Sequence, residues 1–79
     1  MNETVYYYEE NQPVMPGDII QYATSPACIE AILQPNSQEA IAFKCPNGGI
    51  LISTDQFGFI AIEQPDQTDW DEIQLIKRA

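Results

Sequence analysis

The segment GILISTDQFGFIAIE, residues 49–63, consists of two β-prone runs separated by a short polar turn. In GILIST, residues 49–54, successive side chains divide between two faces, as they do along a strand. FIAIE, residues 59–63, is rich in the branched and aromatic residues that strands favour. DQFG, residues 55–58, has the length and the closing glycine of a hairpin turn. We therefore expect an antiparallel hairpin and a mainly β fold.

The glycines in front of this hairpin raise the question of phosphate binding. PNGG, residues 46–49, follows Cys45 and leads into the apolar run. A P-loop requires Lys and Ser or Thr after its last glycine and then enters a helix, whereas a β-prone run follows here. We interpret the segment as a bend in which glycine accepts positive φ.

Three further strands are predicted on either side of the hairpin. DIIQYA, residues 18–23, follows a Pro-Gly-Asp turn, and CIEAILQ, residues 28–34, lies beyond it. We expect TSP, residues 24–26, to end the first of these strands. IQLIK, residues 73–77, predicts a last strand. In the 28–34 strand, alternation places Ile29, Ala31 and Leu33 on one face.

The segment NSQEAIAFK, residues 36–44, has two competing interpretations. Asn36 and Glu39 have the spacing of a capping box, and Ala40 and Phe43 are one helical turn apart. The alternative is a strand, residues 39–44, with Ile41 and Phe43 facing inward. We favour the short helix.

Two regions remain beside the predicted strands and the short helix. Residues 1–15 form an N-terminal extension to a single domain, residues 16–79. Within the extension, TVYYY, residues 4–8, predicts an added edge strand or a mobile arm. PDQTDWDE, residues 65–72, predicts an acidic loop around the only tryptophan. Oligomeric state cannot be read from the sequence, although an exposed first strand could pair two copies edge to edge.

Charge is the most unusual bulk property of the chain. Its 79 residues include 12 acidic and 3 basic ones, for a net charge of −9. Nucleic acids and anionic membranes are recognised by Lys and Arg, so neither is an expected partner. The negative field would attract a basic protein, although it could equally serve only solubility. With no signal-like N-terminus and no apolar run of about 18 residues, a cytoplasmic location is expected.

The residues needed for catalysis or metal binding are largely missing. The chain has no histidine and only two cysteines, Cys28 and Cys45, so a four-ligand zinc site is excluded. We expect both thiols to be reduced, small buried hydrophobic groups. The acidic residues of the 65–72 segment lack the spacing of a calcium-binding EF-hand. Without a histidine base for a serine or cysteine nucleophile, no enzyme activity, metal or other cofactor is predicted.

Five segments together resemble a known family. They are PGDII (16–20), EAIL (30–33), PNGGILI (46–52), DQFGFIAI (55–62) and DEIQLIKR (71–78). In this order they resemble small bacterial proteins with a barrel of the Src-homology-3 type, several of which are encoded near polymorphic toxins and are regarded as immunity proteins. The chain departs from the family pattern in its Tyr-rich extension and in a DQFG turn without the usual acidic pair.

The resemblance covers residues 16–78. The predicted strands by themselves allow a small barrel or a sandwich, and the resemblance implies an all-β, five- to six-stranded barrel. Residues 36–44 would add one short helical turn to it. The resemblance also implies a non-catalytic binding protein that neutralises a cationic toxin. The alternative is an accessory or adaptor subunit of a larger enzyme complex, a role that barrels of this type often have.

Three surfaces are predicted to contact the partner. The first joins the tryptophan to the surrounding carboxylates, and comprises Trp70, Asp66, Asp69, Asp71 and Glu72. The alternative role of Trp70 is to cover one end of the core. The second is the tyrosine run Tyr6, Tyr7 and Tyr8, which could become ordered only on binding. The third is Phe57 at the hairpin turn, whose alternative role is to cap the barrel. Tryptophan and tyrosine are enriched among interface hot spots.

Overall fold

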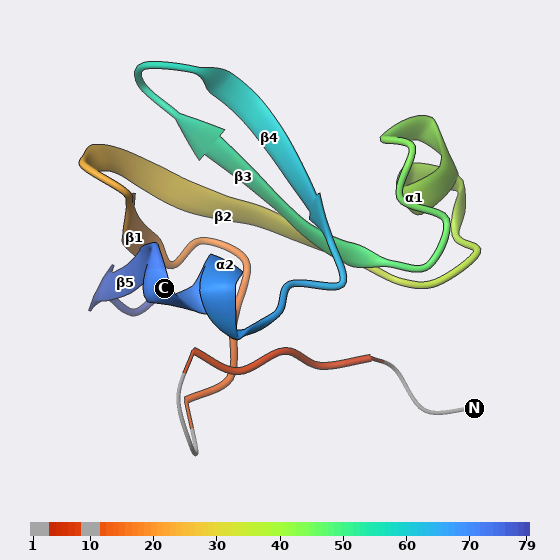
Figure 1. Cartoon of the computed structure of the whole chain (residues 1–79), viewed down its shortest axis with the longest axis horizontal. Helices are drawn as coiled ribbons and strands as arrows, with labels where there is room; N and C mark the ends of the chain where they lie inside the picture. The colour runs from red at the N-terminus through yellow and green to blue at the C-terminus, as the bar shows by residue number, and fades with distance from the viewer. Residues whose placement is uncertain (1–3, 9–11) are drawn as a thin grey trace.

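The protein, described here from a computed structural model that covers residues 4–8 and 12–79, folds around one antiparallel sheet (Figure 1). The strands are β1 (Ile19–Tyr22), β2 (Ser25–Leu33), β3 (Gly49–Thr54), β4 (Gly58–Glu63) and β5 (Ile73–Lys77), and the helices are α1 (Gln38–Ala42) and α2 (Gln67–Asp71). The strand order is β4-β3-β2-β1-β5. The mainly β prediction is confirmed. The sheet is not closed, since β4 and β5 are its two outer strands among the described residues.

The predicted hairpin is formed by β3 and β4. Their register runs from Gly49 opposite Glu63 to Thr54 opposite Gly58, so β4 begins one residue earlier than expected. The Thr54 hydroxyl holds the turn together, because it accepts from the Phe57 N–H at 2.7 Å and donates to the Gly58 carbonyl at 3.0 Å. Gly58 has a φ of 75°, a backbone conformation that would be strained for a residue with a side chain.

The predicted break at residues 24–26 is wrong in part. β2 begins at Ser25, which pairs with Tyr22 of β1. The connection between the two strands is therefore only Ala23 and Thr24, and Ala23 takes the positive φ of 55° that such a short turn requires. Pro26 lies close to the start of β2, a position where strands tolerate proline.

A β-bulge at Glu30 divides β2 into two halves. Ile29 is opposite Ile52 of β3 and Ala31 is opposite Leu51, so Glu30 is the extra residue. Because the bulge reverses the alternation, Ile29 and Ile32 pack on one side of the sheet and Leu33 on the other. The expectation that Ile29, Ala31 and Leu33 share a face is therefore wrong.

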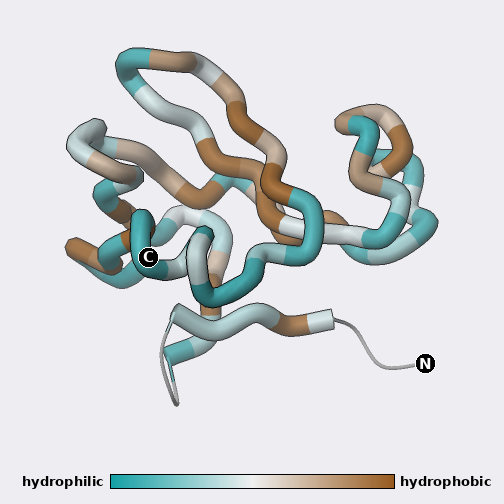
Figure 2. The backbone as a smooth tube through the Cα atoms, viewed as in Figure 1, coloured by the Kyte–Doolittle hydropathy of each residue, from teal (hydrophilic) through white to brown (hydrophobic). Residues whose placement is uncertain are grey.

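Two hydrophobic clusters lie on opposite sides of the sheet. The first cluster is built on the buried residues Val14, Ile20, Ala27, Ile29, Ile50, Ile52 and Ile73. The second is smaller and contains Leu33, Ala40, Cys45 and Leu51, with α1 contributing Ala40. Figure 2 shows the hydrophobic backbone segments, in brown, concentrated where the central strands approach one another.

The helical interpretation of residues 36–44 is confirmed, but the cap is Ser37. Its side chain accepts from the Ala40 N–H at 3.1 Å, whereas Asn36 has a left-handed φ of 63° outside the helix. After α1, Gly48 makes the predicted bend with a φ of 88°, and a Cβ there would lie 2.7 Å from the Leu33 carbonyl oxygen. Cys45 is buried as expected, while Cys28 is only half-buried.

The described part of the N-terminal extension packs against the sheet without joining it. Tyr7 forms an isolated bridge with Pro13, the Val14 N–H donates to the Tyr6 carbonyl at 2.8 Å, and Val14 is buried in the first cluster. Closer to the N-terminus, the Gln34 side-chain amide accepts from the Thr4 N–H and donates to the Thr4 carbonyl. Residues 1–3 and 9–11 of the predicted extension lie outside the described residues. We call residues 4–8 and 12–15 the N-terminal arm.

Two further features of the fold concern strand pairing and helix length. β1 lies between β2 and β5, so it has no free edge with which to pair a second copy. Within the described ranges, no helix is long and apolar enough to cross a membrane.

Candidate partner-binding site

The predicted acidic loop contains a short helix, α2. Asp66 is its N-cap and accepts from the Asp69 N–H at 3.1 Å, while the Asp69 carboxylate accepts from the Asp66 N–H at 2.9 Å. This reciprocal capping box could have been recognised from the Asp-x-x-Asp spacing, but aspartate stands where glutamate or glutamine is usual. Two of the predicted contact carboxylates therefore stabilise the helix.

The other two predicted carboxylates, Asp71 and Glu72, are exposed at the end of α2. Asp71 accepts a hydrogen bond from the Gln67 side chain, with 3.0 Å between Nε2 and Oδ1, one helical turn away. Glu72 is the C-cap, and its carbonyl accepts from the Ala23 N–H at 2.7 Å, which fixes α2 to the β1–β2 turn. Neither the Asp71 nor the Glu72 side chain belongs to the capping box, and both place negative charge on the exposed surface of α2.

Trp70 is half-buried and packs with tyrosines of the N-terminal arm. Its ring centroid lies 6.4 Å from that of Tyr6, and 5.9 Å from that of Tyr8 in an edge-to-face arrangement. Both distances are in the range of favourable aromatic pairs. All three rings also contact the first hydrophobic cluster. The structure thus joins the first predicted surface to Tyr6 and Tyr8 of the second.

A buried carboxylate that the sequence analysis did not single out holds Tyr8 in place. Asp18 is fully buried, and its Oδ2 accepts from the Tyr8 hydroxyl at 2.7 Å and from the Met15 N–H at 3.0 Å. Its Oδ1 accepts from the Ala79 N–H at 2.9 Å. Asp18 therefore ties the N-terminal arm to the C-terminal end of the chain. Its only signal in the sequence is its place in the Pro-Gly-Asp turn.

The ionisation states of Asp18 and Tyr8 follow from their surroundings. Burial alone would raise the pKa of Asp18, but hydrogen bonds from Tyr8, Met15 and Ala79 and the nearby Arg78 outweigh it, and the pKa is lowered. Burial, followed by the hydrogen bond to Asp18, raises the pKa of the Tyr8 hydroxyl. At neutral pH the pair is therefore a carboxylate that accepts from a neutral phenol.

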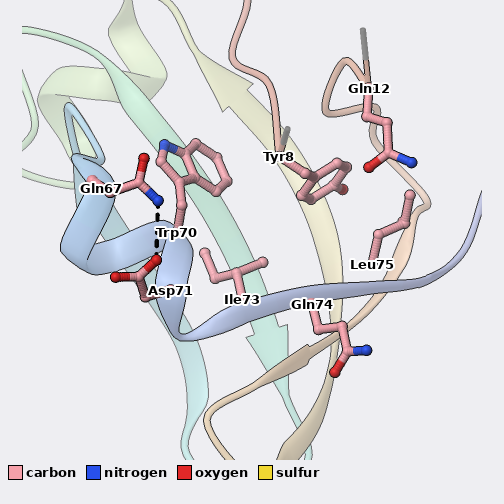
Figure 3. Close-up of a pocket in the computed structure, with 8 residues that line it drawn as sticks. All are labelled: Tyr8, Gln12, Gln67, Trp70, Asp71, Ile73, Gln74 and Leu75. Atoms are coloured by element: carbon pink, nitrogen blue, oxygen red, sulfur yellow. Dashed lines mark hydrogen bonds between the residues drawn. The ribbon is translucent and has the colours of Figure 1, made fainter. Parts of the chain in front are cut away.

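A pocket opens between α2, β5 and the arm (Figure 3). Its volume is about 320 Å³, and we call it the α2 pocket; it is lined by Tyr8, Gln12, Gln67, Trp70, Asp71, Ile73, Gln74 and Leu75. In Figure 3 the Trp70 and Tyr8 rings stand on either side of the opening, and Ile73 and Leu75 lie below them. The pocket thus combines aromatic walls with amide groups and one carboxylate.

The remaining predicted contact residues lie elsewhere. Tyr7 is 51% exposed and alternates with Tyr6 and Tyr8 along the arm, outside the aromatic cluster. Phe57 is 61% exposed in the β3–β4 turn, so it does not serve as a core cap. Phe57 is not among the residues that line the α2 pocket. Phe57 is therefore a separate surface from the α2 pocket.

The described residues contain no group of three or more His, Cys, Asp or Glu side chains arranged to hold a metal ion. Comparisons with protein-family models, curated proteins and solved structures find no match to this chain.

Proposed function

We propose that this chain is a non-catalytic binding protein that recognises a basic protein partner through the surface around α2. The observation that supports the proposal most directly is that exposed carboxylates lie next to a partly exposed aromatic side chain. Asp71 and Glu72 are exposed beside the half-buried Trp70, in a chain with a net charge of −9. Half-buried aromatic residues supply contact area, and the surrounding negative charge speeds the approach of a cationic partner.

The narrower form of the proposal is an immunity protein that neutralises a cationic toxin. Its support is the family resemblance together with the absence of histidine and the acidic surface. Coexpression with a toxin encoded beside this gene tests it, because an immunity protein restores growth. Co-purification with a stable enzyme assembly, without protection, would favour the adaptor alternative and contradict the immunity role.

We also propose that the sheet belongs to a partly open barrel of the Src-homology-3 type. The support is the strand order, in which β5 returns to pair with β1, and the bulged β2, which pairs with β1 at its start and with β3 along most of its length. An experimental structure in which β2 runs straight past Glu30 in one flat sheet would contradict this.

The binding proposal is tested with two variants that each remove two negative charges. Asp71→Asn with Glu72→Gln alters the α2 surface, while Asp55→Asn with Glu39→Gln alters exposed carboxylates on the β3–β4 turn and α1. The probe is hexalysine, titrated at low and high salt. We expect salt-sensitive binding that the α2 variant weakens several-fold more than the control variant, because nearby charges interact most strongly. Equal weakening, or binding that salt does not change, would contradict the assignment of the surface.

A further inference from the structure

We propose that the α2 pocket receives a single arginine side chain of the partner. This inference rests on the proposed function and names the chemical group that the surface recognises. The pocket volume of about 320 Å³ is at the small end of ligand sites, which commonly occupy about 300–1,000 Å³. A cavity of this size can hold one side chain of a protein.

The polar groups of the pocket match a cationic group with several donors. Its charged lining residue is Asp71, and no Lys or Arg is among the lining residues. Asp71 accepts the Gln67 side chain through Oδ1, and the described residues make no hydrogen bond to its Oδ2. The side-chain oxygens of Gln12, Gln67 and Gln74 are further potential acceptors around the opening. A guanidinium carries five N–H donors and no acceptor, so it can pair with the Asp71 carboxylate and still donate to a neighbouring amide oxygen.

The apolar groups of the pocket favour arginine over lysine. The Trp70 and Tyr8 rings flank the opening, and Ile73 and Leu75 form its lower side. A guanidinium is planar, stacks on aromatic faces and is weakly hydrated, whereas an ammonium is compact and strongly hydrated. Entering a half-enclosed pocket therefore costs a lysine more hydration than it costs an arginine.

The pocket is held ready for this group before binding. The Tyr8 hydroxyl is bonded to the buried Asp18, so its ring is fixed against Trp70 at 5.9 Å between centroids. Asp18 therefore acts as a positioning residue for the pocket wall. A preformed wall lowers the ordering cost of binding, which makes selectivity for one side chain possible.

Trp70 is the only tryptophan of the chain, so its fluorescence reports on the pocket directly. We would titrate the full chain with hexaarginine, hexalysine and hexaglutamate and follow the emission of Trp70. We expect a saturable change with hexaarginine and an affinity about fivefold or more above that for hexalysine, from stacking on an aromatic ring. Asp71→Asn should lower the hexaarginine affinity by about fivefold, as loss of one charged hydrogen-bond partner predicts. The matched control, Asp55→Asn, lies outside the pocket and should change it far less.

The possible results distinguish the arginine pocket from the broader proposal of a basic partner. Equal affinities for hexaarginine and hexalysine, or equal losses in Asp71→Asn and Asp55→Asn, would overturn the arginine pocket and leave the proposed basic partner standing. Failure of both cationic peptides to bind more tightly than hexaglutamate would overturn both. A hexaarginine preference that Asp71→Asn reduces and Asp55→Asn spares supports both.

Discussion

Asp18 is the residue on which the arrangement of the candidate site depends most. It is fully buried and accepts three hydrogen bonds, from Tyr8, Met15 and Ala79. Two of these come from the N-terminal arm and one from the end of the chain. Buried carboxylates are tolerated when they are fully hydrogen-bonded, so losing these partners costs more than losing a surface charge. The residue therefore links chain stability to the position of the pocket wall.

Asp18→Asn should lower the free energy of unfolding by about 2–3 kcal/mol, because the amide NH₂ faces donors where an oxygen accepted them. Tyr8→Phe removes only the hydroxyl donor and should cost about 1 kcal/mol. Urea denaturation followed by Trp70 fluorescence measures both. If Asp18→Asn lowers the free energy of unfolding by less than Tyr8→Phe does, the role given to this carboxylate is contradicted.

The same carboxylate predicts how stability depends on pH. Because its pKa is lowered from 3.8 in the folded protein, its contribution is complete above that value and is lost as the pH falls through the lower folded pKa. Stability of the native chain should therefore decline below about pH 4 more steeply than that of Asp18→Asn. Urea midpoints measured between pH 2 and 6 test this, and parallel pH profiles for the two proteins would contradict it.

Among the elements, β2 determines which side chains face each hydrophobic cluster. Its bulge at Glu30 allows Ile32 to pack with the first cluster and Leu33 with the second. Glu30 itself is exposed, and its carboxylate accepts from the Ser53 hydroxyl at 2.8 Å. The importance of the position therefore lies in the extra backbone residue and not in the side chain.

Deleting Glu30 should exchange the faces of Ile32 and Leu33 relative to the residues before them. Moving two large apolar side chains out of their clusters is expected to cost about 3–6 kcal/mol, enough to unfold a small domain at room temperature. Glu30→Ala keeps the bulge and should change stability by less than about 1 kcal/mol. Circular dichroism and urea denaturation compare the two. A deletion variant as stable as Glu30→Ala would show that the bulge does not set the register.

Local signals in the sequence predicted the helices and strands better than the details of how they pair, bulge and begin. The β3–β4 hairpin and β5 follow from alternation and turn residues within a short window, and both are present. The bulge could not be predicted, since Glu30 differs in no local property from a regular strand residue. The capping box of α2 was missed because Asp69 stands where a longer side chain is usual.

At the scale of the whole molecule, the candidate site depends on contacts between distant parts of the chain. The Tyr8–Trp70 pair and the Asp18–Ala79 hydrogen bond each join the N-terminal region to the C-terminal one. Such contacts leave no periodic signal, so the sequence predicted Trp70 and the tyrosines as two separate surfaces. Their union beside Asp71 and Glu72 concentrates aromatic area and negative charge at one place, which is the basis of the proposed function.

The most direct test of that proposal is residue-by-residue mapping of the contact with a basic ligand. Hexaarginine added to the isotopically labelled chain should shift the NMR signals of the Trp70 indole N–H, the Asp71 and Glu72 amides and the Gln67 and Gln74 side-chain amides. Signals of Glu39 and Asp55, which are also exposed and acidic, should move little. Shifts spread evenly over all exposed carboxylates, or confined to the β3–β4 turn around Phe57, would contradict the account.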